Sequence, residues 1–563
     1  MLSMYVGIFF FMWSIIFMLL GVNFVFYGYI YMLEWNIISL NSVDFYMLFM
    51  VDWMSLFFLS VVFFISSMVL IYSVDYMSGE IYFNRFILLI LLFVVSMMLM
   101  ILSPSLLSIL LGWDGLGLIS YCLVSYYQNV KSYNASMLTV LMNRLGDTGM
   151  MMALSLVFYK GSWNLVVYSY SGGDNLIVLL LCLAAFTKSA QIPFSSWLPA
   201  AMAAPTPISS LVHSSTLVTA GVYLMIRFNH LLVKSELKEV MLILSMLTMF
   251  MAGLSANWEY DLKKIIALST LSQLGLMMSI LSLGGVNQAF FHLLTHAMFK
   301  ALLFMCAGVI IHSMKNFQDI RFMGSISYLM PYTFVCFNVA NLALMGMPFL
   351  SGFYSKDLIL EELMFMGDSF LVFSLFMVSI GLTVSYTLRM FMYSVFYEIK
   401  MVSCFNLTDL NYRMNFSMIF MSAMSVVSGK FLMSLMFFNF DLIFLPMFMK
   451  LMVIYFSLLG LLLGMMMFHI NQFFSDNHLF MVTYLNKMWF LFDIFYHLLG
   501  GVFIFSGKIL VLSENLWNED FAYKNLFSMM LFYSRKLDYF YINSFKLVLF
   551  IYFYIIFMFM YIS

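Results

Sequence analysis

Residues 86–103 read FILLILLFVVSMMLMILS, a run without a charged side chain or a proline. A helix needs about 20 apolar residues to cross a hydrocarbon layer of roughly 30 Å, whereas a transmembrane β-strand alternates over about 10 residues. The run is therefore typical of a membrane-spanning helix. Similar runs recur outward from it in both directions, and we count about fifteen spans of this kind in the chain.

The composition supports the same conclusion. Of the 563 residues, 64% are hydrophobic and 9% are charged, and the mean hydropathy is +1.01. A soluble domain carries roughly 25% charged residues, so a soluble enzyme, a nucleic-acid-binding protein and a disordered scaffold are excluded. A net charge of -1 gives no reason to expect a nucleic-acid partner. We predict an all-α, polytopic membrane helix bundle of about 15–16 spans.

Two spans contain a proline beside a lysine. Pro193 follows Lys188 in one apolar run, and Pro348 precedes Lys356 in another. Proline removes a backbone hydrogen bond, and a broken helix is tolerated inside a membrane where its backbone lines a polar cavity. We therefore predict two broken helices, related by an inverted repeat, with ion sites at the breaks.

We divide the chain into five segments. They are N-terminal spans (1–84), a core (85–396), C-terminal spans with a connection (397–506), an amphipathic helix (507–545) and an anchoring span (546–563). The fourth mixes apolar and charged residues at helical spacing, which is typical of a helix lying along a membrane surface and long enough to bridge neighbouring subunits. The alternative is a short surface helix with loops.

The N-terminal sequence and the codon-dependent composition suggest where the chain is made. No lysine or arginine precedes Arg85, so we expect neither a signal peptide nor an Arg-rich transit peptide. The 57 Met, 64 Phe and 34 Tyr suggest an AT-rich organelle genome. The five cysteines are far apart without a CxxC pair, so we expect no disulfide framework, zinc site or iron–sulfur site.

Ionisable residues inside the spans are the strongest functional signal, because each costs at least about 2.5 kcal/mol at membrane depth. Burial disfavours the charge of a lysine or a carboxylate, and a nearby opposite charge restores it, so such groups can exchange protons near neutral pH. Histidine titrates there with little perturbation. A proton path is the predicted chemistry, and its candidate residues are Asp114, Arg144, Asp147, Lys188, His213, His292, His296, Lys300, Lys356 and Asp357.

Structural alternatives remain for several of these residues. Arg144 and Asp147 share a helix face at i,i+3 and could form a purely structural ion pair. His213 could be a hydrogen-bonded packing residue. His292 and His296 at i,i+4 could bind a metal, but neither HExxH nor a third ligand is present, so we expect no metal. The lysines cannot all be idle at this depth.

The motifs around these residues resemble a known family. They are LLGWDGLGLISY (110–121), NRLGDTG (143–149), the stretch from KSAQIPF (188–194), HLLTHAMFK (292–300) and GMPFLSGFYSKD (346–357). Together they are similar to the antiporter-like chain 5 family of NADH–ubiquinone oxidoreductase, the mitochondrially encoded distal subunits of respiratory complex I, and most like arthropod members.

The resemblance implies a role for each motif. Asp114 would pair with Lys188, although many relatives carry glutamate at that position and the shorter aspartate would need a water to reach the lysine. Arg144 and Asp147 would form the conserved pair of the NRxGD element. His213, His292, His296 and Lys300 would form a central relay, and Lys356 with Asp357 an outlet. The N-terminus looks short for the family's usual helix pair, so we expect fifteen spans, with sixteen as the alternative.

The resemblance also implies partners and a location. The chain would move protons in the mitochondrial inner membrane, driven by electron transfer in other subunits that carry FMN, iron–sulfur clusters and ubiquinone. It would itself hold no cofactor. Its partners would be other membrane-arm subunits, especially antiporter-like neighbours, and bilayer lipids including cardiolipin. The alternatives are a subunit of a Na+/H+ antiporter, which shares the core motifs, and a mainly structural membrane subunit.

Overall fold

A computed structural model describes residues 2–41, 43–161, 163–164, 174–366, 369–398, 408–409, 411–437, 443–470 and 479–562. The chain forms two compact units, residues 1–491 and 492–563. Cys404 and its expected packing role lie outside the described residues, whereas the four described cysteines are free thiols. The five segments defined from the sequence stay a prediction, and one of them (397–506) crosses the boundary between the two units.

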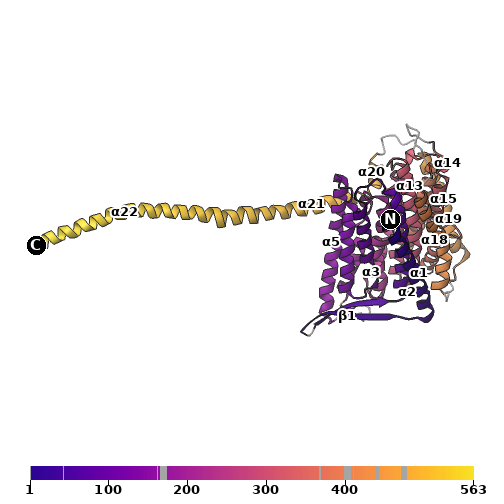
Figure 1. Cartoon of the computed structure of the whole chain (residues 1–563), viewed down its shortest axis with the longest axis horizontal. Helices are drawn as coiled ribbons and strands as arrows, with labels where there is room; N and C mark the ends of the chain where they lie inside the picture. Colours follow the sequence, from indigo (N-terminus) through magenta and orange to yellow (C-terminus); the bar gives the residue numbers. More distant parts are fainter. Residues whose placement is uncertain are drawn as a thin grey trace. The chain divides into compact units, whose positions relative to one another are not determined.

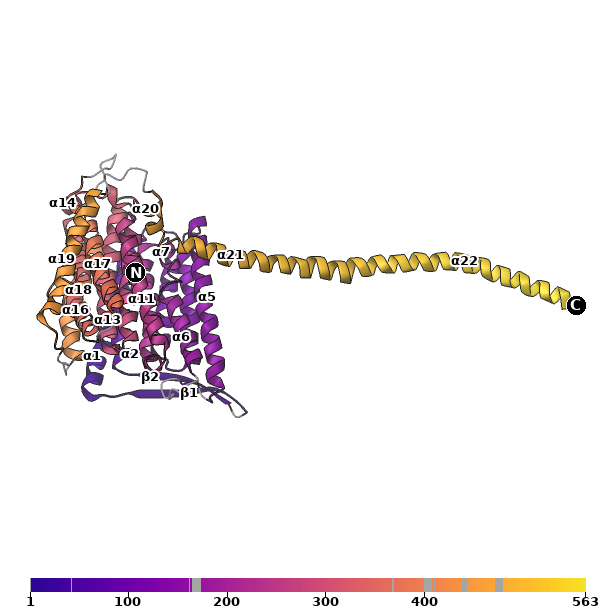
Figure 2. The ribbon, with the colours of Figure 1, turned by 180° about the vertical axis from the view of Figure 1, so that it is seen from behind.

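The first unit is a bundle of helices that run in a common direction, with a β-hairpin across one end (Figures 1 and 2). Its N-terminal half contains α1 (Leu2–Tyr27), β1 (Tyr31–Leu40), β2 (Val43–Val51), α2 (Trp53–Tyr76), α3 (Phe83–Leu102), α4 (Leu106–Val124), α5 (Val130–Phe158), α6 (Asn175–Lys188), α7 (Trp197–Ala201), α8 (Thr206–Ile208), the π-helix η1 (Ser209–Thr216), α9 (Leu217–Arg227), α10 (Asn229–Lys234) and α11 (Leu237–Trp258).

The rest of the bundle contains α12 (Leu262–Ser282), α13 (Val286–Ser313), the 3₁₀-helix η2 (Ile320–Phe322), α14 (Ile326–Leu329), α15 (Pro331–Met345), α16 (Ser351–Met366), α17 (Phe370–Val395), α18 (Tyr412–Met436), α19 (Met447–Ile470) and α20 (Leu479–Asn486). Twelve helices of the described chain are long and apolar enough to cross a membrane. Each span expected from the sequence coincides with a helix. The expected spans outside these twelve are the broken helices and α5, whose 29 residues include Lys131, Arg144 and Asp147.

Two helices with buried ionisable side chains lie at the centre of the bundle. The spanning windows of α12 and α13 are fully buried inside the protein, whereas those of α1 and α19 are only 17% buried. A helix surrounded by other helices can carry polar groups that need partners, while a peripheral helix faces lipid and must be apolar. The candidate proton-path residues on α13 are therefore shielded from the bilayer.

Both predicted helix breaks are present. The helix α6 ends at Lys188, five positions before Pro193, and α7 begins only at Trp197. The second break separates α15 from α16, with Gly346 in the left-handed conformation at φ 89° and Pro348 inside the gap. The left-handed conformation favours glycine because a Cβ atom would clash there.

The β-hairpin is a feature that the helical prediction missed. Strands β1 and β2 pair antiparallel from Tyr31–Val51 to Leu40–Val43, around a turn at Asn41 with φ 55°. Asparagine tolerates this conformation better than most residues. The abundance of aromatic and apolar side chains hid the strand alternation in the sequence. Because residues 31–40 and 43–51 form strands, they contribute no membrane-spanning helix between α1 and α2.

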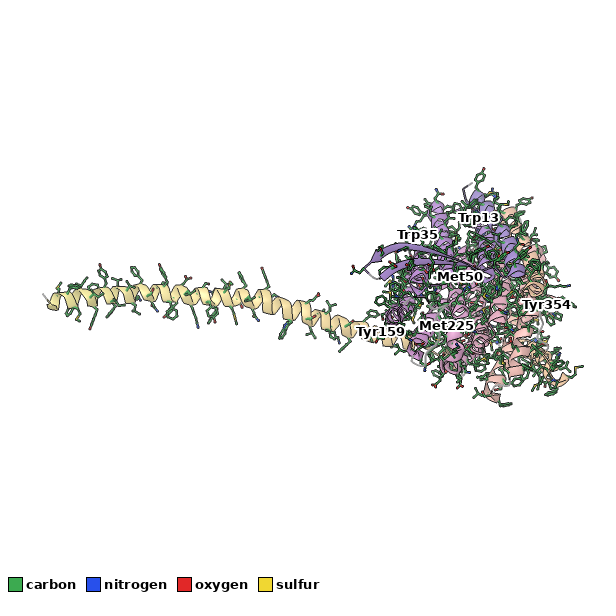
Figure 3. The ribbon with its side chains drawn as sticks, turned by 90° about the horizontal axis from the view of Figure 1, so that it is seen from below. Trp13, Trp35, Met50, Tyr159, Met225 and Tyr354 are labelled. Atoms are coloured by element: carbon green, nitrogen blue, oxygen red, sulfur yellow. The ribbon has the colours of Figure 1, made fainter. Side chains whose placement is uncertain are left out.

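The second unit is one long helix. Its segments are α21 (Leu491–Leu510), the π-helix η4 (Val511–Lys524) and α22 (Asn525–Ile562), and they follow one another without a break. This confirms a long helix rather than a short one with loops. The helix α22 continues through residues 545–546, where no glycine or proline occurs to interrupt it. Large apolar side chains project along the described length of α22 (Figure 3).

A buried ion pair joins the hairpin end of α2 to the end of α9. Asp52 caps α2 by accepting a hydrogen bond from the Ser55 main-chain N–H at 2.9 Å. Its Oδ1 also accepts one from Arg227 at 2.8 Å, and the side chains are only 10% and 9% exposed. Burial raises the pKa of Asp52, but the hydrogen bonds and charge of Arg227 outweigh it and hold that pKa below its usual value.

We expect Asp52→Ala to lower the stability of the protein by about 3–5 kcal/mol at neutral pH, because it leaves Arg227 buried without its carboxylate. A lowered folded-state pKa contributes stability above the unfolded value of about 3.9, and this is lost as pH falls through the folded value. The thermal midpoint difference from wild type should be constant from about pH 5 to 8 and shrink below about pH 4. Asp44→Ala, at an exposed position, is the control; equal shifts in the two variants would contradict the assignment.

Candidate functional site: a row of buried ionisable side chains

Lys188 is the first member of the row and lies at the end of α6. Its side chain is fully buried, and its Nζ donates a hydrogen bond to the main-chain carbonyl of Trp113 on α4 at 2.8 Å. The ammonium also lies 4.6 Å from the centre of the Trp113 ring, a cation–π distance. At the break after Lys188, the ammonium is therefore held by two uncharged groups, the carbonyl and the ring of Trp113.

Two carboxylates, Asp147 and Asp114, lie near Lys188, and Asp147 has more contacts that hold it in place. Its Oδ1 accepts a hydrogen bond from Trp113 Nε1 at 2.9 Å, and its Oδ2 lies 3.4 Å from the Arg144 guanidinium. Its side chain is 11% exposed. Trp113 therefore bonds to Asp147 through its ring and to Lys188 through its carbonyl, so it links the acid on α5 to the base on α6.

Asp114 and Lys188, which the resemblance pairs through a water, interact electrostatically without direct contact. No ion pair within 4 Å joins these two described residues; Asp114 instead lies 3.9 Å from Arg144 and is 34% exposed. Two acids and two bases nevertheless form a neutral group of four: Asp114, Arg144, Asp147 and Lys188.

A close approach of α5 and α6 brings the acid and the lysine together. A Cβ atom on Gly146 would lie 2.0 Å from the hydroxyl oxygen of Thr187, a distance that no real structure permits. Gly146 directly precedes Asp147, and Thr187 directly precedes Lys188. The absence of a side chain at Gly146 therefore allows α5 and α6 to pack closely enough to bring Asp147 near Lys188. We call Asp114, Arg144, Asp147 and Lys188 the first charged group.

His213 lies on the π-helix η1, which the sequence analysis did not foresee. It is 1% exposed, and neither ring nitrogen has a hydrogen-bond partner among the described residues. Its ring packs edge-on against that of Trp197, with 6.3 Å between the two ring centres. Trp197 Nε1 donates a hydrogen bond to the Thr187 carbonyl at 2.9 Å. Trp197 thus contacts both His213 and Thr187, the residue before Lys188. Short π-helical segments occur frequently at functional sites.

Lys300 and His296 lie one turn apart on the buried helix α13. Lys300 is fully buried and donates a hydrogen bond to the hydroxyl of Ser269 on α12. His296 is also fully buried, and both of its ring nitrogens lack a partner in the described part of the chain. Buried polar atoms of this kind are usually satisfied by ordered water.

His292 connects three helices. Its Nδ1 is 2.9 Å from the hydroxyl of Ser355 on α16, and its Nε2 is 3.2 Å from Gln273 Oε1 on α12. The ring centres of His292 and His296 are 6.1 Å apart. The broken helix that contains Lys356 is therefore hydrogen-bonded to the helix that contains Lys300.

Lys356 completes the row after the second break. It is 2% exposed, and its Nζ donates to the hydroxyl of Thr383 on α17 at 2.9 Å. Its neighbour Asp357 follows it on α16 and interacts with it electrostatically, without an ion pair within 4 Å between these described residues. Again the base is held by a neutral oxygen.

Sequence reasoning missed the partners of these charges. Trp113 was recognisable because it lies inside the GWDG motif, but Ser269, Ser355 and Thr383 carry no signal, since serine and threonine are common in membrane helices. It also missed Arg389 on α17, which is 1% exposed and donates to the carbonyl of Asn257 at the end of α11. A cation there is favourable because the last carbonyls of a helix carry partial negative charge.

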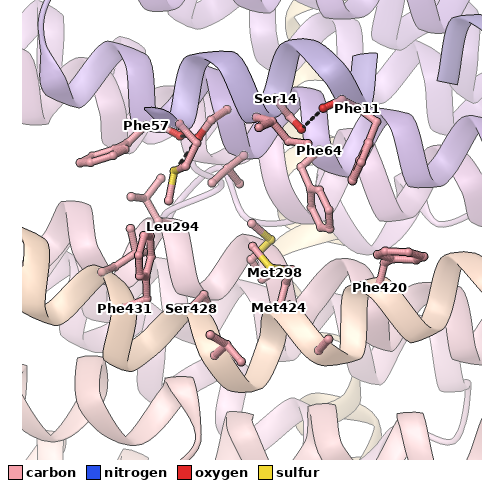
Figure 4. Close-up of a pocket in the computed structure, with 17 residues that line it drawn as sticks. Phe11, Ser14, Phe57, Phe64, Leu294, Met298, Phe420, Met424, Ser428 and Phe431 are labelled. Atoms are coloured by element: carbon pink, nitrogen blue, oxygen red, sulfur yellow. Dashed lines mark hydrogen bonds between the residues drawn. The ribbon is translucent and has the colours of Figure 1, made fainter. Parts of the chain in front are cut away.

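An apolar cavity elsewhere in the bundle is separate from this row. It has a volume of about 250 Å³ and lies between α1, α2, α13 and α18 (Figure 4). Phe11 and Phe420 line one end of it, and Phe57 and Phe431 the other. Its wall contains no ionisable side chain, so it contributes nothing to a proton path.

Comparisons with known proteins agree with this arrangement. Residues 35–87 match the family model for the N-terminus of NADH-ubiquinone oxidoreductase (complex I) chain 5, residues 103–383 the model for the NADH:quinone oxidoreductase/Mrp antiporter membrane region, and residues 386–563 the model for the C-terminus of NADH dehydrogenase subunit 5. The chain is 50% identical to NADH-ubiquinone oxidoreductase chain 5 of Aedes aegypti over 94% of its own length and 93% of that protein. The corresponding protein of Anopheles gambiae is 51% identical over the same shares.

The chain belongs to the NADH-ubiquinone oxidoreductase chain 5 family. Chain 5 is an antiporter-like, multi-pass membrane subunit of mitochondrial complex I, and therefore part of an enzyme complex with other subunits. The alternative of a Na+/H+ antiporter subunit is not favoured. The fold is shared more widely: the structure of the Mrp complex from Dietzia sp. DQ12-45-1b superposes with a TM-score of 0.70 at 23% identity. That match covers 90% of this chain and 60% of the other.

The geometry around Asp114, Arg144, Asp147 and Lys188 predicts unequal effects of removing the two acids. We expect Asp147→Ala to destabilise the protein by about 1.5–3 kcal/mol, the usual contribution of a hydrogen bond to a charged group. Asp114→Ala should cost less than about 1 kcal/mol, because its pair with Arg144 is long and partly exposed. Thermal unfolding of the detergent-solubilised complex measures both. Equal shifts, or a larger one for Asp114→Ala, would contradict the anchoring role of Asp147.

Proposed function

We propose that this chain carries protons across the mitochondrial inner membrane through the row of buried side chains that runs from the first charged group to Lys356 and Asp357. The carriers are Asp114, Lys188, His213, His292, His296, Lys300, Lys356 and Asp357, joined by water. Arg144 and Asp147 set the charge balance around Lys188. Electron transfer from NADH to ubiquinone in other subunits drives the movement.

The observation that supports this proposal most strongly is how the three buried lysines are held. Lys188, Lys300 and Lys356 are at most 2% exposed. Each donates to a neutral oxygen, and none lies within 4 Å of a carboxylate among the described residues. An ammonium in low dielectric without a carboxylate in contact is only weakly favoured over the neutral amine. Small movements of nearby charges can then release or recapture its proton.

A mainly structural role predicts a different arrangement. Ion pairs that only hold helices together would place a carboxylate against each buried ammonium, because an unpaired charge costs several kcal/mol. Such a pair is found for Asp52 and Arg227 in this protein. The three lysines of the row lack that arrangement in the described chain, which favours proton exchange.

We further propose that the redox chemistry belongs to other subunits. The sequence contains no Walker motif, no GxGxxG and no CxxC pair. FMN, iron–sulfur clusters and ubiquinone would then be bound elsewhere in the complex, and this chain would hold no cofactor. Its contacts would include neighbouring antiporter-like subunits and the lipid bilayer, with cardiolipin among the lipids.

Lys188→Ala tests the proposal. We expect proton transfer through this subunit to slow by about 100-fold or more, the usual effect of losing a positioned proton-transfer group. Coupled NADH:ubiquinone turnover and the proton-to-electron ratio in vesicles should fall, while NADH oxidation by an artificial acceptor is unchanged. Lys238→Ala removes an exposed lysine and is the matched control. A normal proton-to-electron ratio in an assembled Lys188→Ala complex would refute the role.

Ordered water in the row provides a second test. The unpartnered ring nitrogens of His213 and His296 predict water molecules within about 3 Å of each. A high-resolution map of the native membrane complex should show a nearly continuous polar chain from Asp114 through Lys188, His213 and Lys300 to Asp357. A dry, tightly packed row would support the structural alternative instead.

A further inference from the structure

A second cavity, which is polar, lies at the end of the bundle where α5 and α12 begin. It has a volume of about 280 Å³, and α7, the short helix after the first break, forms part of its wall. Three of its lining residues are lysines and one is an acid. The polar residues that matter here are Asn129, Lys131, Asp261, Lys263, Lys264 and Gln318. None of them belongs to the row of proton carriers.

The lysines occupy unusual positions in their helices. Lys131 is in the first turn of α5, and Lys263 and Lys264 are in the first turn of α12. The start of a helix carries a partial positive charge of about half a unit, so lysine is disfavoured there and acids are preferred. Neither first turn contains an acid. Two helix ends and three ammonium groups therefore direct positive potential into one cavity.

Internal partners do not balance this charge. Asp261, the acid in the wall, already pairs with Lys264 at 3.1 Å. Lys263 is 5% exposed and donates to the main-chain carbonyl of Ala204 at 3.2 Å. It lies close enough to Lys131 for the two to repel each other. Neither Lys131 nor Lys263 has a carboxylate within 4 Å in the described chain.

The cavity wall is held by main-chain hydrogen bonds. The N–H of Leu262 donates to the carbonyl of Gln318 at 2.9 Å, and the N–H of Ile320 donates to that of Tyr260 at 3.0 Å. These bonds fix the start of α12 against the segment after α13. Lys263 is thus held at the fixed start of α12, next to the exposed Lys131. An anion bound in the cavity would offset the repulsion between the two ammonium groups.

We propose that this basic cavity binds a phosphate group. Lysine ammonium groups are common phosphate ligands, and basic pockets at the ends of membrane helices bind lipid headgroups. The volume admits a phosphate together with several waters, each of which occupies about 30 Å³ in the liquid. The phosphate comes from a phospholipid headgroup or from free phosphate in solution. This site is independent of the proton-carrying role, because it shares no residue with the row.

The test compares the delipidated complex with a Lys131→Gln/Lys263→Gln variant. Phosphatidylglycerol is added in one arm and inorganic phosphate in the other, and binding is measured by native mass spectrometry and calorimetry. We expect the variant to lose about tenfold or more in affinity, given the contribution of each basic residue to anionic lipid binding. Lys234→Gln/Lys238→Gln, at two exposed positions, is the matched control and should bind as wild type does.

The two arms separate the sources. Lysine-dependent binding of phosphatidylglycerol assigns the site to a headgroup, and lysine-dependent binding of phosphate alone assigns it to the free ion. If the double variant fails to assemble, Lys131→Gln, at an exposed position, carries the test and should weaken binding severalfold. Unchanged affinity in both arms would overturn the proposal, as would a neighbouring subunit's carboxylate against Lys263 in a map of the complex.

Discussion

A charged side chain in the hydrocarbon layer must find its polar partners inside the protein, and the architecture of the bundle depends on this constraint. Helices with buried charges, such as α12 and α13, are therefore surrounded by other helices on every side. Peripheral helices such as α1 and α19 expose apolar side chains to lipid. The same requirement explains why Arg389 lies against the carbonyl end of α11, where unpaired backbone oxygens are available.

Two sets of buried charges differ in the kind of partner that they contact. Asp52 and Arg227 are in direct contact, so both stay ionised and hold two helix ends together. Lys188, Lys300 and Lys356 are hydrogen-bonded to a carbonyl or a hydroxyl instead. A neutral acceptor stabilises an ammonium less than a carboxylate does, and this difference is the basis of our proposal that these lysines carry protons.

Irregular backbone occurs at or next to three of the buried ionisable side chains of the row. Lys188 ends one half of a broken helix, His213 lies on a π-helix, and Lys356 follows the second break. Each irregularity frees main-chain groups or turns a side chain away from regular helical spacing. Glycine has the complementary role, since the absence of a side chain at Gly146 allows Thr187, and with it Lys188, to approach α5 closely.

The sequence by itself determined the membrane class, the helical spans, both breaks and the positions of the buried charges, because apolar runs, prolines and intramembrane charges are properties of the local sequence. Only the tertiary structure decided the partners: Trp113 rather than Asp114 for Lys188, Ser269 for Lys300, and Thr383 for Lys356. It also decided the hairpin and the basic cavity around Lys263. Serine, threonine and main-chain carbonyls occur throughout the chain, and which of them meets a given charge depends on how distant helices pack.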